Sequence, residues 1–185
     1  EILPLIGRRD PNLSRLQARL ERCASIGDIR AMARRRVPRS VFDYTDGAAG
    51  SELSLNRSRR AYARVEFTPR VLRNVADVDP SVTMLGKRSE LPFAFGPTGF
   101  TRMMHYIGEP AVSPVAGQPG IPFALSTLGT TSVEDLAAAT PDTRRWFQLY
   151  VSRDHESAAA LVKRAADSGY DTLILTVDAA VGGIR

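Results

Sequence analysis

Residues 122–150 decide the fold that this sequence predicts, and they run PFALSTLGTTSVEDLAAATPDTRRWFQLY. An apolar segment, 122–125, is followed by a hydroxyl-rich turn, a helical pattern and a second apolar segment, 146–149. The run Ser132–Asp135 has the form of a capping box and starts the helical pattern. Short apolar runs that alternate with helices are typical of parallel strands with both faces buried. The stretch therefore predicts a strand, a helix and a second, parallel strand.

The same alternation continues on both sides of this stretch. Further apolar segments lie at 92–95 and 172–175, so four segments follow one another about 25 residues apart. A second helical pattern separates the last two and carries its apolar residues on one face. Four such β/α units fit either an open doubly wound sheet or the first half of a TIM (β/α)8 barrel. The apolar residues of that second pattern are Ala158, Leu161, Val162 and Ala165.

Polar groups favour the barrel over the open sheet. Each apolar segment ends in groups able to contact a ligand, and a barrel brings the C-terminal ends of its strands together at one mouth. An open dinucleotide-binding sheet would instead carry G-x-G-x-x-G after its first strand, and this fingerprint is absent. In chain order, these groups are Pro97, Thr98 and Gly99; Ser126 and Thr127; Gln148 and Tyr150; and Thr176 and Asp178.

The first 80 residues carry helical patterns in place of this alternation. An N-terminal arm leads into them, Gly47 ends the third helix, and Ser51 is the expected N-cap of the fourth. Near residue 81 the pattern changes, and residues 81–88 predict a small hairpin. We therefore expect a helical part, 1–80, and a part with the hairpin and four β/α units, 81–185. The helices expected in the first part are 13–22, 28–36, 38–46 and 52–63.

Residues 109–117 depart from the pattern. The helix between the first and second apolar segments should lie here, yet Pro110, Pro114 and Pro119 fall across it and just after it. A proline in a helix interior costs about 3 kcal/mol. The sequence therefore predicts a broken helix, unless the residue identities in this region are themselves in error.

Composition limits the class of protein. Of the 185 residues, 43% are hydrophobic and 24% charged, and the apolar runs are far shorter than the roughly 20 residues of a membrane-spanning helix. The N-terminus lacks the pattern of a secretory signal, and the single Cys23 suits a reducing compartment. We expect a cytoplasmic protein, with peripheral contact at the inner face of the cell membrane as the alternative.

The chain is basic, with a net charge of +5 and a run of three arginines at 34–36. Such a run suits a nucleic-acid or anionic-membrane surface. However, these arginines close a helical stretch, where cations complement the helix dipole, and no aromatic residues interleave with them. We therefore predict no nucleic-acid partner, and we predict no metal site.

Seven motifs in order resemble those of the FMN-dependent α-hydroxy-acid dehydrogenases and oxidases. The resemblance covers about residues 26–185 and is strongest to the L-lactate dehydrogenase type that passes electrons to a quinone or cytochrome. The motifs are Val41-Phe42-Asp43-Tyr44 with Gly47-Ala48-Ala49, Leu85-Gly86, Gly96-Pro97-Thr98-Gly99, Met104-His105, Leu125-Ser126-Thr127, Phe147-Gln148-Leu149-Tyr150 and Leu175-Thr176-Val177-Asp178.

The resemblance assigns roles to individual positions. It implies that Tyr44 and Tyr150 contact the carboxylate and hydroxyl region of the substrate, and that Arg185 pairs with the carboxylate. It also implies that Asp178 pairs with the catalytic histidine. The positions that match FMN-binding residues are Pro97, Thr98, Gly99, Ser126, Gln148 and Thr176.

These residue types suit the oxidation of a small 2-hydroxy acid. A guanidinium binds a carboxylate through two parallel hydrogen bonds, which would aim the α-hydrogen at the flavin. The resemblance implies that a histidine takes the hydroxyl proton while a hydride passes to the flavin. Neither His105 nor His155 matches that histidine. We therefore expect the chain to be one segment of a longer polypeptide, inactive alone, whose C-terminal half completes the barrel.

Several properties stay open at this stage. L-Lactate is the expected substrate, because Leu128 is modest in size at a position near the substrate side chain, but mandelate- and glycolate-type activities are alternatives. The electron acceptor is a quinone, a cytochrome or oxygen, and the resemblance suggests a homotetramer or larger. Two rival functions are a flavin- or phosphate-binding barrel of another reaction class and a basic, non-enzymatic interaction protein.

Overall fold

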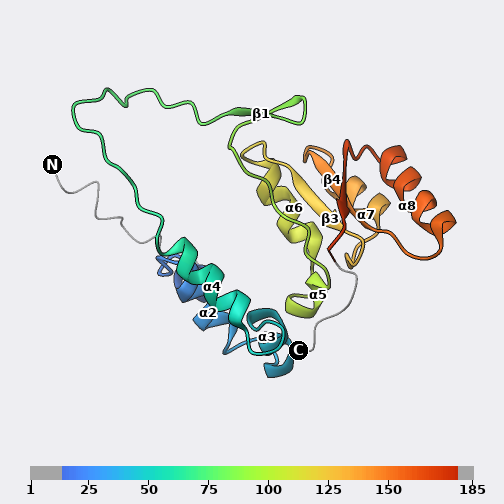
Figure 1. Ribbon diagram of the computed structural model, residues 1–185, viewed down its shortest axis with the longest axis horizontal. Coiled ribbons are helices and arrows are strands. Elements are labelled where there is room, and N and C mark those ends of the chain that lie inside the picture. The colour runs from blue at the N-terminus through green and yellow to red at the C-terminus, as the bar shows by residue number, and fades with distance from the viewer. Residues whose placement is uncertain (1–13, 179–185) are drawn as a thin grey trace. The chain divides into compact units, whose positions relative to one another are not determined.

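The structure is a computed structural model that describes residues 14–178 (Figure 1). The chain divides into two units, Glu1–Gly47 and Ala48–Arg185. This division falls earlier in the chain than the boundary that we expect between residues 80 and 81. The expected boundary separates helical patterns from β/α units, and it stays a prediction.

Within its described residues, the first unit contains three short helices. Ser25 starts the second of them with a capping box, in which its hydroxyl accepts from the Asp28 backbone N–H and the Asp28 carboxylate accepts from the Ser25 N–H. Arg30 forms a two-pronged ion pair with Asp46 and lies over the Phe42 ring. These helices confirm the predicted ranges to within a few residues. They are α1 (Arg15–Leu20), α2 (Ile26–Ala33) and α3 (Arg39–Asp46).

The second unit begins with α4 (Leu53–Tyr62) and a hairpin. Glu52, and not the predicted Ser51, is the N-cap of α4; it adopts φ +58°, and its carboxylate accepts from the Ala48 N–H at 3.0 Å. The predicted hairpin is confirmed as β1 (Val82–Met84) paired antiparallel with β2 (Lys87–Ser89). Its two-residue turn places Leu85 and Gly86 at φ +48° and +78°, the combination that a type I′ turn requires.

Three parallel strands form the sheet of this unit, in the order β3-β4-β5 (Figure 1). Helices alternate with them along the chain, as the sequence predicts. The strands are β3 (Phe123–Ser126), β4 (Arg145–Tyr150) and β5 (Thr172–Thr176). The helices are α5 (Thr101–Met104), α6 (Glu109–Gly117), α7 (Val133–Ala139) and α8 (His155–Asp167).

The strand predicted at 92–95, the first of the four along the chain, is wrong in its extent. Only Phe95 pairs with β3: its N–H donates to the Pro122 carbonyl at 2.9 Å, and its own carbonyl accepts from the Ala124 N–H at 3.0 Å. Pro92 has no N–H to contribute to a ladder, which limits pairing at the start of the segment. The segment nevertheless lies beside β3, where the first strand of a half-barrel belongs.

The two faces of the sheet differ in chemistry. Phe147 and Leu149 of β4 pack with Leu125 and Leu136 in a core formed with the helices, which also holds the predicted apolar residues of α8. Side chains alternate along a strand, so Gln148 lies on the opposite face. The helices thus cover one face of the sheet, and the polar residues of the strand ends occupy the other.

The helix α6 forms without a break, so the prediction of a broken helix is wrong. Pro110 lies in the first turn, where a backbone N–H has no helical partner to lose, and Pro119 lies beyond the helix end. Pro114 is an interior proline, but Ser113 and Ala116 on the same helix are completely buried. Tertiary packing therefore offsets the cost of this one proline.

A charged cluster fastens the hairpin to the N-terminal ends of β4 and β5. Arg144 donates to the Met84 carbonyl at 2.8 Å and to the Asp171 carboxylate at 2.8 Å, and Lys87 pairs with the same carboxylate at 2.9 Å. The side chains of Arg144 and Asp171 are only 13% and 17% exposed. Burial raises the pKa of Asp171, but the hydrogen bonds from Arg144 and Lys87 outweigh it and lower the pKa below its ordinary value.

We expect Asp171→Asn to destabilise the protein by about 2 kcal/mol, because it leaves Arg144 and Lys87 without their shared anion. Since the folded-state pKa is lowered, this stabilisation is present above the ordinary aspartate range and is lost as pH falls through the lowered pKa. Urea unfolding across acidic pH measures both effects, with the exposed Asp142→Asn as control. Equal stability of the two variants at neutral pH would contradict the prediction.

Candidate active site

A row of polar side chains crosses the sheet where its strands end. Gln148 of β4 is in the centre: its Oε1 accepts from the Ser126 hydroxyl of β3 at 3.0 Å, and its Nε2 donates to the Thr176 hydroxyl of β5 at 2.8 Å. The strand register pairs Ser126 with Gln148 directly. Gln148 and Ser126 are 2% and 6% exposed. These three residues, here called the rim row, come from three strands and meet at one edge of the sheet.

The rim row retains hydrogen-bonding capacity for a ligand. An amide nitrogen carries two N–H groups, and only one of those on Gln148 is directed at Thr176. The Thr176 hydroxyl accepts that bond and can still donate its own hydrogen. An amide and hydroxyls held in this way suit the polar edge of a flat heterocycle.

A glycine loop closes against the end of β3 beside this row. A Cβ atom on Gly99 would lie 2.9 Å from the Cβ of Leu128, so only glycine fits without displacing Leu128. The Phe100 N–H donates to the Leu128 carbonyl at 2.9 Å, and the Leu128 N–H donates to the Ser126 hydroxyl at 3.1 Å. The structure therefore brings the loop of Pro97, Thr98 and Gly99 to the same end of the sheet as Ser126.

Comparison with known proteins gives the family. The family model described as FMN-dependent dehydrogenase matches residues 33–185. This chain belongs to that family. An L-lactate dehydrogenase of Caulobacter vibrioides is 43% identical over 162 residues, which are 88% of this chain and 42% of the relative. The 4-hydroxymandelate oxidase of Amycolatopsis orientalis is 39% identical over 154 residues, 83% of this chain and 43% of the relative.

Solved structures of FMN-dependent dehydrogenase relatives share the fold. A soluble mutant of the membrane-associated (S)-mandelate dehydrogenase from Pseudomonas putida matches with a TM-score of 0.82 and 39% identity, over 86% of this chain and 45% of that one. A provisionally named L-lactate dehydrogenase of Mycobacterium tuberculosis is 45% identical over all 185 residues, which are 45% of its own length. The chain thus spans about half the length of the relatives it matches, as expected for the first half of a TIM barrel.

The structure describes three of the four predicted substrate-site residues. Tyr150, at the end of β4, is 37% exposed and pairs in register with Thr176 at the rim row. Asp178 is exposed just beyond β5, on the strand that carries Thr176. Tyr44 lies on α3 in the first unit, so its role at the rim stays a prediction. Arg185 lies outside the described residues.

Two residues without an assigned role hold the loop between β3 and α7. Thr127 bridges this loop to β4 through its side chain. Glu109, at the start of α6, is 1% exposed, and its carboxylate accepts from the Thr130 N–H and hydroxyl, both at 2.7 Å, and from the Thr131 hydroxyl at 2.8 Å. The hydroxyl-rich run 130–132 was the available signal in the sequence, but no pattern identified its acceptor.

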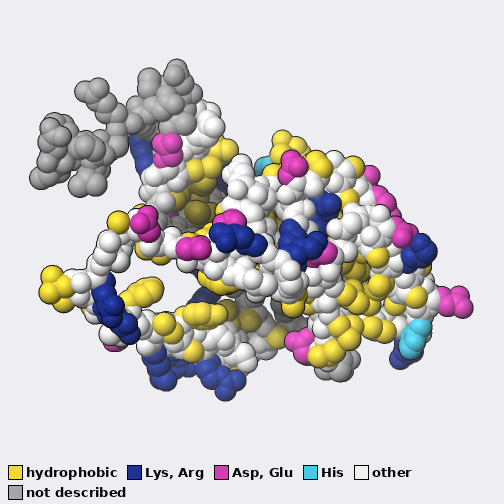
Figure 2. All heavy atoms as spheres, turned by 90° about the horizontal axis from the view of Figure 1, so that it is seen from above, with side chains coloured by type: hydrophobic (Ala, Val, Ile, Leu, Met, Phe, Trp, Pro, Cys, Tyr) yellow, Lys and Arg dark blue, Asp and Glu magenta, His cyan; other side chains and the backbone are white. Residues whose placement is uncertain are grey.

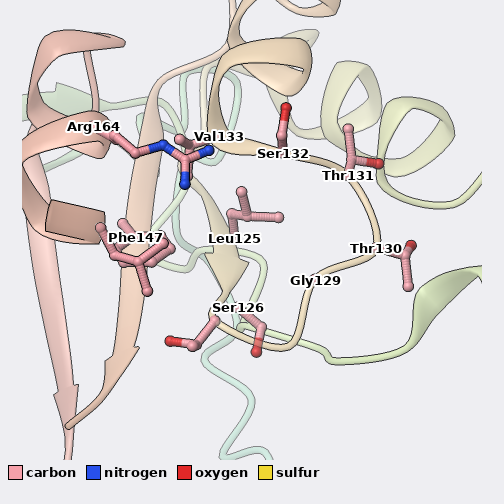
Figure 3. Close-up of a pocket in the computed structure, with 11 residues that line it drawn as sticks. Leu125, Ser126, Gly129, Thr130, Thr131, Ser132, Val133, Phe147 and Arg164 are labelled. Atoms are coloured by element: carbon pink, nitrogen blue, oxygen red, sulfur yellow. The ribbon is translucent and has the colours of Figure 1, made fainter. Parts of the chain in front are cut away.

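A cavity of about 240 Å³ lies beside the same loop (Figure 3). Leu125 and Phe147, which face the helices, line it together with Leu161 and Arg164 of α8. The described residues that line it include Ser126 but neither Gln148 nor Thr176. This cavity therefore lies mainly on the helix side of the sheet, and the flavin site expected from the sequence is the rim row on the other face.

Proposed function

We propose that this chain supplies the first half of an FMN-dependent enzyme that oxidises an L-2-hydroxy acid, with L-lactate to pyruvate as the first candidate reaction. The observation that carries the proposal is the rim row, in which side chains from three adjacent parallel strands hydrogen-bond to one another at one edge of the sheet. Family membership says which cofactor such a row would serve.

The residues present fit a flavin. The spare N–H of Gln148 and the hydroxyl of Thr176 offer donors to the ring edge, and the backbone of Pro97–Gly99 lies at the same end of the sheet. When bound there, FMN supplies the acceptor for a hydride. Glycine at position 99 lets the loop pack closely on Leu128, so that its backbone groups can face a ligand.

Three further residues, which the family resemblance assigns, would hold the substrate. We assign Tyr44 and Tyr150 to the carboxylate and hydroxyl region and Arg185 to the carboxylate itself, because a guanidinium makes two parallel hydrogen bonds to it. A histidine from the second half of the barrel would take the hydroxyl proton, and FMN, when bound, would supply the acceptor for the hydride from Cα. Asp178 would pair with that histidine and stabilise its charged form.

The choice of substrate depends on Leu128, which is 44% exposed beside the glycine loop. A modest apolar side chain favours the methyl group of lactate. Mandelate- or glycolate-type activity is the alternative, and relatives of this chain include a 4-hydroxymandelate oxidase and a 2-hydroxyacid oxidase. The electron acceptor would be a quinone, a cytochrome or oxygen.

The second half of the same barrel is the principal partner that we propose. Leu173 and Leu175 of β5 are 48% and 52% exposed, although their neighbours on β4 are buried core residues. Figure 2 shows hydrophobic side chains at the surface of the molecule in this view. A β/α unit following β5 would cover these leucines and remove an unpaired strand edge. A homotetramer or larger assembly is a further expectation.

We propose a cytoplasmic protein, with peripheral contact at the inner membrane face as the alternative. Among residues 14–178, no helix has both the length and the apolar composition needed to cross a membrane. A similar (S)-mandelate dehydrogenase is membrane-associated, and this supports peripheral membrane contact as the alternative.

Reduction of the flavin in the absence of oxygen tests the proposed function. The full-length gene product is purified, and L-lactate, glycolate and (S)-mandelate are added separately under anaerobic conditions. We expect L-lactate to bleach the flavin absorption band fastest. A colourless protein, or a flavin that none of the three acids reduces, would overturn the proposal.

Gln148→Glu tests the role of the rim row in binding the flavin. The glutamate keeps an acceptor for the Ser126 hydroxyl but replaces the Nε2 donor with a charged oxygen, so we expect FMN affinity to fall about 10- to 100-fold. Flavin release on dilution measures this effect. The exposed Gln118→Glu, which adds the same charge at the end of α6, should leave affinity unchanged. Equal affinity in both variants would exclude Gln148 as a flavin contact.

A further inference from the structure

Beyond Ser126, bonds that involve side chains replace the backbone ladder between β3 and β4. The parallel pairing of these strands ends at Ser126 and Gln148, whereas the pairing of β4 with β5 continues to Tyr150 and Thr176. On its β3 side, the end of β4 therefore lacks ladder partners. Side-chain bonds from Thr127 occupy this place.

Thr127 and Gln148 exchange side-chain and backbone bonds. The Thr127 N–H donates to Gln148 Oε1 at 3.2 Å, and the Thr127 hydroxyl donates to the Gln148 carbonyl at 2.6 Å. The same hydroxyl accepts from the Tyr150 N–H at 3.1 Å. One hydroxyl thus binds the carbonyl of the last paired residue of β4, Gln148, and the N–H of Tyr150 two residues further on.

We propose that Thr127 is a positioning residue that fixes Tyr150 for binding the acid substrate. The inference rests on the proposed function, in which Tyr150 contacts the acid and Gln148 contacts the flavin. Thr127 touches neither molecule in this scheme. It acts by extending the β3 side of the sheet by two residues, so that the backbone of Tyr150 is held from both neighbouring strands.

The hydrogen bonds predict that loss of the Thr127 hydroxyl affects binding of the acid substrate and binding of the flavin differently. Gln148 keeps its bonds to the Ser126 and Thr176 side chains when the Thr127 hydroxyl is removed. Tyr150 keeps its pairing with Thr176 on β5 but loses the bond from its backbone N–H to Thr127, so this partly exposed strand end is held from one side alone. Removal of the hydroxyl should therefore affect the substrate more than the flavin.

The test compares Thr127→Val with Thr127→Ser in the full-length, flavin-loaded protein. Valine has nearly the same shape without the hydroxyl, whereas serine keeps it. We expect Thr127→Val to lower kcat/KM for L-lactate about tenfold, mainly through a higher KM, with flavin content within about twofold of wild type. Thr127→Ser should stay within about threefold of wild type in kcat/KM.

Thr143, a buried threonine elsewhere in the same unit, controls for general loss of stability. The hydroxyl of Thr143 donates to the Ser113 carbonyl at 3.2 Å, before the start of β4 and away from the rim row. Thr143→Val should lower the melting temperature without changing KM. If the valine variant at position 127 does not fold, Thr127→Ala makes the same comparison with the same expected rise in KM.

Three results would overturn the inference. They are an unchanged KM in Thr127→Val or Thr127→Ala, a serine variant as impaired as the valine variant, and an equal rise in KM in Thr143→Val. These failures differ from failure of the proposed function, in which the wild-type flavin is not reduced by any of the three acids. That last result would remove both proposals together.

Discussion

Replacement of Glu109 by alanine is expected to lower the free energy of unfolding by about 3–5 kcal/mol. The carboxylate is 1% exposed and accepts three hydrogen bonds from the loop after β3, all from neutral donors. Alanine would leave the Thr130 N–H and two hydroxyls without their acceptor and open a cavity beneath the loop. Gly129 lies against the same carboxylate, where a Cβ atom would be 3.5 Å from Glu109 Oε1.

The pH dependence of this stabilisation follows from the pKa of Glu109. Burial raises the pKa of Glu109, but the hydrogen bonds from Thr130 and Thr131 outweigh it and bring the pKa below its ordinary 4.5. The stabilisation is therefore present above pH 4.5 and is lost as pH falls through the lowered pKa. Denaturant unfolding of Glu109→Ala measures the loss, with Glu156→Ala, an exposed acid in the first turn of α8, as control. A loss below about 1 kcal/mol would contradict the prediction.

The second large effect is expected at Asp178. In the proposed enzyme this carboxylate pairs with the histidine that takes the substrate proton, so Asp178→Asn removes the charge that stabilises the imidazolium. General acid–base assistance contributes about 10²- to 10⁴-fold, and we expect kcat for L-lactate to fall by about 10²-fold or more. Flavin content should stay unchanged, because Asp178 lies beyond the rim row.

Steady-state and single-turnover kinetics of the full-length protein measure this effect. Asp167→Asn, at the exposed C-terminal end of α8, is the matched control and should keep wild-type kcat. A kcat for Asp178→Asn within about threefold of wild type would exclude the assigned role, whatever its effect on KM.

Sequence periodicity was sufficient to predict most elements of the second unit. Runs such as 146–149 are too apolar for a surface strand, and the spacing of Ala158, Leu161 and Ala165 predicts the buried face of α8. It failed where tertiary contacts decide the outcome. The helix α6 tolerates Pro114 because Glu109, Ser113 and Ala116 on the same helix are buried. The segment 92–95 forms a single bridge because pairing depends on a partner strand.

The shared edge of the polar strand-end residues was predictable from the sequence, but their hydrogen bonds were not. Polar residues after successive strands imply a shared edge, and the structure places Ser126, Gln148 and Thr176 together there. The bonds of Thr127 and Glu109 were not predictable, because they join residues 21 to 23 positions apart through side-chain geometry. No local pattern records which hydroxyl meets which acceptor.

A crystal structure of the full-length protein with its flavin bound tests the central claim most directly. We predict that Gln148 Nε2 and Thr176 Oγ1 lie at hydrogen-bond distance, about 3 Å, from the polar edge of the flavin ring. A flavin held at another surface, with no contact to Ser126, Gln148 or Thr176, would contradict the assignment of the rim row as the cofactor site.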